Sequence, residues 1–293
     1  MPLSKVGVVA RKDLQGAASV LADIAGWLQA RGIQAMFDTD TAVLAGVPKN
    51  WPIATRDDIP RHVELLVVLG GDGTLLGMAN RIARAGVNIP LLGINFGSLG
   101  FLTEVTLEEV HEALGVALDG HAEVEERMML RGQVVRGGAV ADDRLALNDI
   151  VVNRGSLSRI IDMSITIAGE RVMHVRADGL IVTTPTGSTA YNLAAGGPIV
   201  HPDVDALVLT PIAPHTLTQR PIVIPGESEV RIKPLVEGAN DELYATFDGQ
   251  HGVPLESGDE VVVQRAAQRM KLIRASSRTY FDVLRQKLKW GQR

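Results

Sequence analysis

Apolar residues in the first 120 positions alternate between two spacings. Short β-branched or fully apolar runs predict strands at Lys5–Ala10, Ile33–Phe37, Glu64–Leu69 and Ile89–Asn95. Between them, helical spacing is seen before Gly32, at Val20, Leu21, Ile24, Trp27 and Leu28, and again over Leu75–Ala85 and Leu107–Leu118. Strands that alternate with helices predict an open, doubly wound α/β domain.

The segment 38–61 fits neither spacing. It holds Pro48, Pro52 and Pro60, and proline interrupts both helices and central strands. We therefore predict an irregular loop or a mobile flap here.

The pattern changes near Glu126. From there the chain shows short alternating runs, at Gln133–Val135, Ile165–Ile167, Gly179–Thr184, Glu229–Ile232 and Glu260–Val263, separated by Gly, Pro, Asn and Asp. One helical window interrupts them, at about Ser188–Ala195. These features predict an α/β domain over residues 1–125 and a β-rich domain over residues 126–265.

The last segment, residues 266–293, is basic. From Gln264 onward the chain carries nine Lys and Arg and a single acid, Asp282, whereas residues 1–125 carry 9 basic and 15 acidic side chains. A basic tail can bind nucleic acid, but this one also carries apolar Leu272, Ile273 and Phe281. We predict that it packs on the acidic first domain as an arm and that no nucleic acid is bound.

Composition excludes several classes of protein. The 293 residues are 46% hydrophobic and 22% charged, as in a packed globular protein, and there is no cysteine, so disulfides and thiolate metal sites are excluded. No apolar stretch reaches the roughly 20 residues that span a bilayer, and the start lacks a signal-peptide core. We expect a cytoplasmic protein without membrane contact.

The strongest chemical signal is the loop Gly70-Gly71-Asp72-Gly73, which precedes Thr74 and a predicted helix. Glycines let backbone N–H groups approach a phosphate, and a helix N-terminus adds a favourable dipole. An aspartate repels phosphate unless it holds a cation or takes a proton from an attacking hydroxyl, so the loop suggests phosphoryl transfer. An Asp-Gly turn in which Asp72 satisfies backbone amides is the open alternative.

Two common nucleotide loops are excluded by spacing. Gly71, Gly73 and Gly77 are one residue too widely spaced for the dinucleotide fingerprint. No lysine occurs between Lys49 and Lys233, so a Walker loop is absent. The histidines have no metal-binding spacing, and we predict no metal ligand in the chain.

Three further motifs carry polar groups. Asn95–Leu102 is a second glycine cluster after the next strand, and a plain turn is equally compatible with it. Leu147-Asn148-Asp149 could bind ribose hydroxyls or an adenine edge, although Asn-Asp is also common in turns. Thr184–Pro198 places a Gly-Ser-Thr loop before the helical window of the β domain, which has no evident packing purpose.

Together, in this order and spacing across about residues 64–225, the motifs resemble the NAD kinase family. The Gly70–Gly73 loop alone is shared with lipid kinases and is similar to that of phosphofructokinase, whereas Thr184–Pro198 is specific. The resemblance implies a Rossmann-like N-terminal α/β domain, a β-rich C-terminal domain, an active site between them, and a homodimer or homotetramer. It implies transfer of the γ-phosphate of ATP to the 2′-hydroxyl of the adenosine ribose of NAD, with Mg²⁺ as the divalent cation bound to ATP.

The resemblance also assigns roles to residues. Asp72 would be the base, and Gly70, Gly71, Gly73 and Thr74 would form the phosphate loop. The implied NAD-binding residues are Asp72, Gly73, Asn148, Asp149, Arg159, Arg176, Asp178, Thr189, Ala190, Tyr191, Asn192, Ala194 and Gln250. A lipid or sugar kinase with the same loop, and an NAD-binding sensor without turnover, are the alternatives.

Overall fold

The computed structural model describes residues 3–47, 51–120, 122–155, 160–216, 218–235 and 242–291. The chain divides into two compact units, residues 1–126 with 270–293, and residues 127–269. The predicted boundaries lay after residues 125 and 265. The last segment therefore groups with the first unit from Met270 onward, and its beginning is part of a long strand, β17 (Glu260–Arg274).

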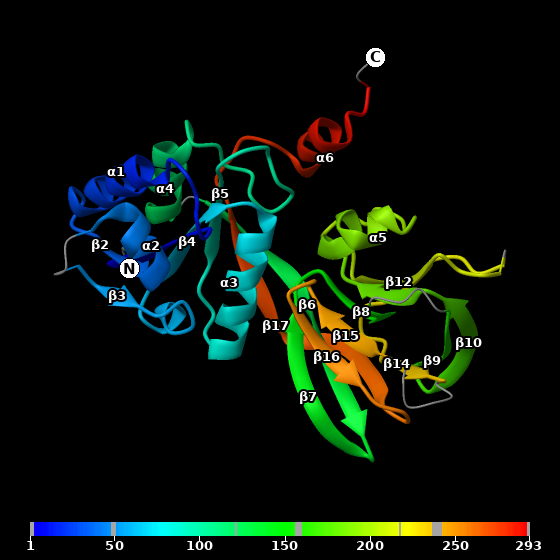
Figure 1. The fold of residues 1–293 in the computed structure, drawn as a ribbon. Coiled ribbons are helices and arrows are strands. Elements are labelled where there is room, and N and C mark those ends of the chain that lie inside the picture. The colour runs from blue at the N-terminus through cyan, green and yellow to red at the C-terminus, as the bar shows by residue number, and fades with distance from the viewer. Residues whose placement is uncertain are drawn as a thin grey trace. The chain divides into compact units, whose positions relative to one another are not determined.

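The first unit is built on a parallel sheet (Figure 1). Its strands are β1 (Lys5–Ala10), β2 (Gln34–Asp38), β3 (Ile53–Ala54), β4 (Leu65–Gly70) and β5 (Leu91–Asn95), in the order β3-β2-β1-β4-β5, and the end of β17 adds beside β5. β4 is buried along its whole length because helices cover both faces of the sheet. The predicted doubly wound α/β fold is confirmed.

The helices of this unit are α1 (Ala17–Gln29), α2 (Thr39–Ala45), α3 (Asp72–Ala85), α4 (Val110–Leu118) and α6 (Tyr280–Leu288), with a 3-10 turn η1 (Ile59–Arg61). The apolar faces of α1 and α4 share one core with β1 and β4, contributed by Leu21, Leu28 and Leu114 among others. On the opposite face, Leu75 of α3 lies against Gly93 of β5, where a Cβ would be 2.7 Å from the leucine side chain.

The prediction of an irregular loop over residues 38–61 was wrong. This segment holds α2, β3 and η1. Two of the prolines that suggested a loop do not interrupt these elements, since Pro60 lies in the first turn of η1, where its missing N–H costs nothing, and Pro52 precedes β3. Tertiary contacts stabilise the short helix, because Thr41 accepts a hydrogen bond of 2.7 Å from the backbone N–H of Ala10. Pro48 lies outside the described residues.

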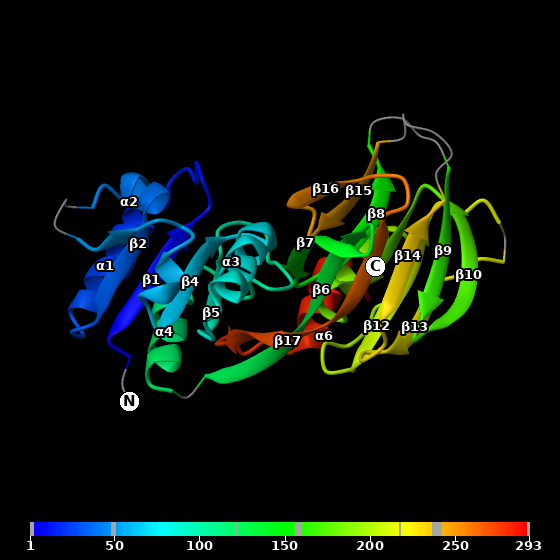
Figure 2. The ribbon, with the colours of Figure 1, turned by 90° about the horizontal axis from the view of Figure 1, so that it is seen from below.

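The second unit contains two β-sheets and little helix. One is antiparallel, in the order β13-β12-β11-β8-β15-β16, from β8 (Asp149–Arg154), β11 (Gly179–Thr183), β12 (Ala206–Ile212), β13 (Ile222–Pro225), β15 (Leu243–Phe247) and β16 (His251–Leu255). In the other, β10 (Glu170–Ala177), β9 (Ile161–Ile167) and β14 (Val230–Pro234) lie side by side (Figure 2) next to the first part of β17. The hairpin of β6 (Glu123–Arg136) and β7 (Ala139–Ala146) joins β17 as well.

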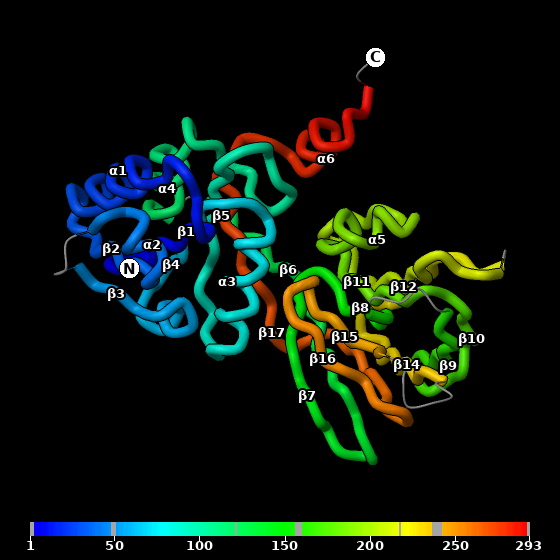
Figure 3. The backbone as a smooth tube through the Cα atoms, in the orientation of Figure 1, coloured from blue at the N-terminus to red at the C-terminus, as the bar shows by residue number. Residues whose placement is uncertain are grey.

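Side chains from both sheets form one apolar core, which includes Ile150, Val182 and Phe247. The helical window predicted in this domain corresponds to a 3-10 turn, η2 (Thr186–Thr189), and the short α5 (Tyr191–Ala194), which follow directly after β11 (Figure 3). The predicted β-rich C-terminal domain is thereby confirmed.

Candidate active site

The loop Gly70–Gly73 joins β4 to α3, at the carboxyl end of the parallel sheet. The predicted helix began at Leu75, but α3 begins at Asp72, which therefore lies in the first helical turn. Gly70 has a φ of 154°, and a Cβ there would be 2.8 Å from the Thr74 hydroxyl, so the fold requires this glycine. A Cβ on Gly71 or Gly73 would meet nothing within 4 Å, so there is open space on the side-chain face of both glycines.

Both carboxylate oxygens of Asp72 accept hydrogen bonds from the loop after β5. Oδ1 accepts from the N–H groups of Leu102 (3.0 Å) and Thr103 (3.1 Å) and from the Thr103 hydroxyl (3.0 Å). Among the described residues, Oδ2 accepts from the N–H of Phe101 alone (2.8 Å). A carboxylate oxygen offers about two lone pairs, so Oδ2 keeps one position from which it can receive another hydrogen.

Asp72 therefore has a structural role, in which its carboxylate accepts hydrogen bonds from backbone amides. This was the alternative to a catalytic role that the Asp-Gly sequence left open. This role leaves Oδ2 able to accept from a substrate, so the predicted function as a base stays a prediction.

The second glycine cluster, Asn95–Leu102, folds around two side chains. Asn95 is buried, accepts the N–H of Gly97 (2.6 Å) and donates to the Ser98 carbonyl (2.7 Å) and the Thr103 hydroxyl (3.0 Å). A Cβ on Gly100 would lie 2.1 Å from Asp72 Oδ1, so only glycine permits this approach. The two glycine loops, which follow the neighbouring parallel strands β4 and β5, are therefore joined.

Two cationic side chains near these loops were missed by the sequence analysis. Arg11 follows β1 and is exposed, and its Cβ lies 3.2 Å from the position of a Cβ on Gly70. Lys287 of α6 has its ammonium group 5.7 Å from the ring centroid of Phe101. The position of Arg11 directly after a strand was a possible signal for this residue, whereas nothing local could have identified Lys287.

In the second unit, the segment Leu147–Asp149 connects β7 to β8. The carboxylate of Asp248 accepts all three of its N–H groups, from Leu147 (2.9 Å), Asn148 (2.7 Å) and Asp149 (3.2 Å). The carbonyl of Asn148 accepts from the Thr183 hydroxyl (2.8 Å) and the Thr184 N–H (2.9 Å). The backbone of the segment is therefore held on both sides.

The side chains of Asn148 and Asp149 are buried, at 8% and 5% exposure. Asn148 Oδ1 has no hydrogen-bond partner in the described part of the chain, and an unpaired buried acceptor is costly unless a ligand supplies the donor. Burial, and then the charge of Asp248, raise the pKa of Asp149 to about 7. Burial likewise raises the pKa of Asp248 to about 6, although three amide hydrogen bonds act in the opposite direction.

The segment Thr184–Pro198 packs directly under Asn148. A Cβ on Gly187 would be 2.3 Å from the Asn148 carbonyl oxygen, so this glycine permits the contact. Thr189, Ala190 and Tyr191 follow it in the chain, and Tyr191 is 45% exposed. The structure therefore brings the start of this segment together with Leu147–Asp149.

Asn192 is different, because its side chain is fully buried and all its polar atoms are used within the protein. Nδ2 donates to the carbonyls of Ser188 (2.9 Å) and Pro198 (3.0 Å), and Oδ1 accepts from the Thr210 hydroxyl (2.6 Å). This geometry favours a structural role for its side chain. Ala194, two residues on, is exposed.

The remaining predicted residues are distributed over the second unit. Gln250 is exposed in the turn between β15 and β16, two residues after Asp248. Asp178 precedes β11, whereas Thr183, which contacts Asn148, ends it, so five strand residues, roughly 17 Å, separate the two ends. Arg176 lies at the same end as Asp178 and pairs with Asp162 at 3.2 Å. Arg159 lies outside the described residues.

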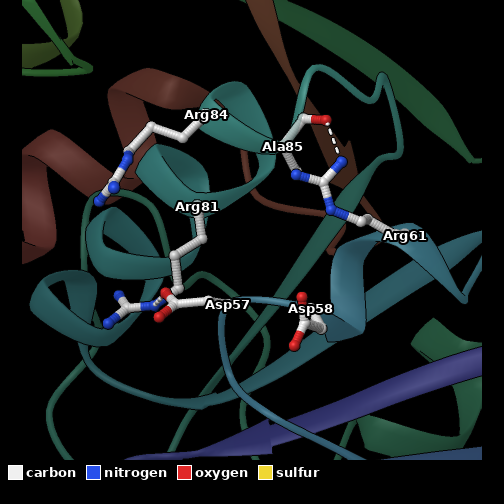
Figure 4. Close-up of a pocket in the computed structure, with 6 residues that line it drawn as sticks. All are labelled: Asp57, Asp58, Arg61, Arg81, Arg84 and Ala85. Carbon is white, nitrogen blue, oxygen red and sulfur yellow. Dashed lines mark hydrogen bonds and ion pairs between the residues drawn. The ribbon is translucent and has the colours of Figure 1, made fainter.

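A cavity of about 200 Å³ in the first unit lies away from the glycine loops. It is lined by Asp57, Asp58, Arg61, Arg81, Arg84 and Ala85 (Figure 4). Arg81 pairs with Asp57 at 2.8 Å, and Arg61 donates to the Ala85 carbonyl at 2.7 Å. Since α3 has 14 residues, or about 20 Å, its C-terminal end at this cavity is remote from Asp72 at its start.

Two searches of the described residues gave negative results. No group of three or more His, Cys, Asp or Glu side chains gathers into a possible metal site within them. None of the helices that the structure describes is long and apolar enough to cross a membrane.

Comparison with known proteins decides between the families that share a glycine loop. Residues 6–122 match the family model of the ATP-NAD kinase N-terminal domain, and residues 147–275 match that of the ATP-NAD kinase C-terminal domain. The chain belongs to the NAD kinase family.

Relatives confirm this over the full length. The NAD kinase of Geotalea daltonii is 44% identical over 291 residues, which cover 99% of this chain and 100% of that protein. The NAD kinase of Thiobacillus denitrificans is 43% identical over 293 residues, which cover 100% and 99%. This chain is therefore an enzyme, a kinase that acts on NAD, and the alternatives of a lipid kinase and a sensor are set aside.

Solved structures agree on the fold. Yeast NADH kinase complexed with NADH superposes with a TM-score of 0.87 at 24% identity, covering all of this chain and 89% of the other. An NAD kinase from Archaeoglobus fulgidus in complex with ATP has a TM-score of 0.75 at 26% identity, with 96% and 99% covered.

Proposed function

We propose that this member of the NAD kinase family transfers the γ-phosphoryl group of ATP to the 2′-hydroxyl of the adenosine ribose of NAD, giving ADP and NADP. The observation that carries the proposal is the free acceptor position on Asp72 Oδ2, next to two glycines whose backbone has open space on the side-chain face. A fixed carboxylate beside an open phosphate loop suits the activation of a hydroxyl for phosphoryl transfer.

In this mechanism the 2′-hydroxyl donates its hydrogen bond to Asp72 Oδ2. As the 2′-oxygen forms its bond to the γ-phosphorus, its proton passes to Asp72, and the bond from the γ-phosphorus to the bridging oxygen of ADP breaks in line. The four donors that hold the carboxylate keep Oδ2 in place, because rotation of the side chain would break all of them.

NAD would be recognised in the second unit. The unpaired Asn148 Oδ1 is an acceptor for the adenine amino group or a ribose hydroxyl, and Asp149 beside it can bind a hydroxyl as donor or acceptor near neutral pH. Gln250 and the stretch Thr189–Tyr191 would add contacts around them.

The charge of the triphosphate needs a cation. We propose that Mg²⁺ arrives bound to ATP and neutralises part of this charge, while the backbone N–H group of Gly71 binds a phosphate oxygen. Arg11, at the edge of the loop, would supply a permanent positive charge. An excess of chelator should then abolish turnover without unfolding the enzyme.

We also propose that the chain assembles with itself, as a homodimer or homotetramer. Arg176 and Asp178 lie at the far end of β11 from Asn148, so a second copy is the simplest way to bring such residues to an NAD molecule. Light scattering on the purified protein would measure the assembly, and a monomer that is fully active at every concentration would contradict the proposal.

One assay tests the function. The purified chain is incubated with NAD and ATP·Mg, and NADP is detected with an NADP-specific dehydrogenase. NAD with a 2′-deoxyadenosine ribose should bind without reacting. A product phosphorylated at another hydroxyl would refute the proposed acceptor.

A further inference from the structure

Asp248 begins the turn between β15 and β16. It follows β15, which pairs with β8 so that Phe247 is opposite Ile150. This register places Asp248 beside Asp149, whose carbonyl accepts the N–H of Asp248 at 3.0 Å. With a φ of 51°, Asp248 turns its carboxylate back toward the segment before β8.

We infer that Asp248 is a positioning residue for NAD, because its carboxylate fixes the backbone from which the Asn148 side chain extends. This inference rests on the proposed function. Oδ1 of Asp248 accepts from Asn148 and Asp149, and Oδ2 accepts from Leu147. Three consecutive amides that converge on one carboxylate determine the orientation of the peptide planes, and with them the direction of each Cα–Cβ bond.

The opposite side of the same backbone is equally restrained. Thr184 donates its hydroxyl to the Leu147 carbonyl at 2.7 Å, and Thr183 donates to that of Asn148. The polar groups of the backbone are thus used, whereas Asn148 Oδ1 is not. A backbone held rigidly around one buried oxygen without a partner is suited to bind a ligand that presents a hydrogen-bond donor at that position.

The position of the charge supports the same reading. Burial of Asp248 disfavours its carboxylate, and its charge raises the pKa of Asp149. Two carboxyl groups are therefore held close together in a buried place, an arrangement that is more common in binding sites than in turns that serve folding alone.

Asp259 provides a matched control. It lies in the turn at the other end of β16, is 1% exposed, accepts the N–H of Glu256 at 2.8 Å and pairs with Arg136 at 2.8 Å. Asp259→Asn removes a carboxylate charge from the turn between β16 and β17, without touching Leu147–Asp149.

The test measures NAD dissociation constants and the KM values of NAD and ATP for the wild type, Asp248→Asn, Asn148→Ala, the double variant and Asp259→Asn. We expect Asp248→Asn to weaken NAD binding by at least about tenfold while the KM of ATP changes little. In the Asn148→Ala background the same change should have an effect below roughly threefold, because its target side chain is gone. Asp259→Asn should lower the melting temperature and leave NAD affinity unchanged.

Wild-type affinity in a folded Asp248→Asn, or losses that simply add in the double variant, would overturn the inference. If Asp248→Asn does not fold, the same measurements are made on Asp248→Glu, which keeps the charge but displaces it by one methylene. If the wild type neither binds nor phosphorylates NAD, the proposed function is rejected, and this inference with it. The measurements on the wild type alone identify that outcome.

Discussion

The carboxylate of Asp72 has a structural role, and we propose a catalytic role for it as well. Three donors on Oδ1 and one on Oδ2 hold the loop 100–103 in place, and the remaining lone pair of Oδ2 is free for a substrate. A substitution at this position therefore changes both the loop and the chemistry, and a second variant is needed to separate them.

We expect Asp72→Asn to lower turnover by about 10²–10⁴-fold, the usual value of general base catalysis. Thr103→Val removes one donor to Oδ1 but keeps the carboxylate, so it should lower turnover only a few-fold. Steady-state kinetics and melting temperatures of both variants would show whether turnover depends on the carboxylate itself or on the order of the loop. Equal losses in turnover would mean that Asp72 acts only by organising the loop.

Arg11 directly follows β1, and its Cβ lies beside Gly70 of the candidate phosphate loop. We expect Arg11→Ala to raise the KM of ATP by about tenfold, with less effect on the KM of NAD, because a charge-assisted phosphate contact is lost. Lys12→Ala is the control, since Lys12 is the next residue and pairs with Asp40 at 3.1 Å. A similar KM of ATP in both variants would remove Arg11 from the site.

At the scale of elements, the C-terminal segment is bound to the glycine loops. Arg274 pairs with Glu104 at 3.2 Å and with Glu125 at 3.0 Å. Arg278 donates to the carbonyl of Glu104 at 3.0 Å and forms two hydrogen bonds of 2.9 Å with Glu109. Glu104 follows Thr103, which holds Asp72, so the segment before α6 supports the candidate base indirectly.

Arg278→Ala should therefore lower both the melting temperature and turnover. The half-buried ion pair with Glu109 is worth about 1 kcal/mol, and loss of the bond to Glu104 should loosen the loop and reduce turnover several-fold. Arg285→Ala is the matched change, since Arg285 pairs with Asp282 within the exposed turn of α6. Unchanged turnover in a destabilised Arg278→Ala would limit this segment to a structural role.

At the scale of the whole molecule, the acidic pair of the second unit links stability to pH. The pKa of Asp149 rises from 3.8 to about 7 on folding, so between these values the folded state binds more protons than the unfolded state. The contribution of Asp149 to the free energy of unfolding is therefore fully present below about pH 4 and is lost as the pH rises to about 7.

Asp149→Asn should accordingly raise the melting temperature relative to wild type at pH 8, and the difference should shrink toward pH 5. Asp143→Asn gives the opposite sign, because Arg131 lowers the pKa of Asp143 and the carboxylate stabilises the fold above its unfolded pKa. Thermal melts of both variants at the two pH values test the prediction. A pH-independent gain in Asp149→Asn would contradict the coupling.

The sequence by itself indicated the main alternation of strands and helices in the first unit, the β-rich character of the second unit and the positions of the glycine loops. These features follow from local spacing, since a helix or a buried strand is encoded in neighbouring residues and a phosphate loop needs its glycines in sequence. It did not reveal the short elements of residues 38–61, whose stability comes from contacts such as that between Thr41 and Ala10.

Only the tertiary structure decided which groups complete each motif. Asp248 lies 100 residues from Asn148, and Phe101 lies 29 residues from Asp72, yet each pair is joined by a hydrogen bond. These partners are brought together by strand register and by the meeting of parallel strand ends, which no local pattern of residues encodes. The sequence therefore indicated the reaction, whereas the folded chain determined which side chains hold its groups in place.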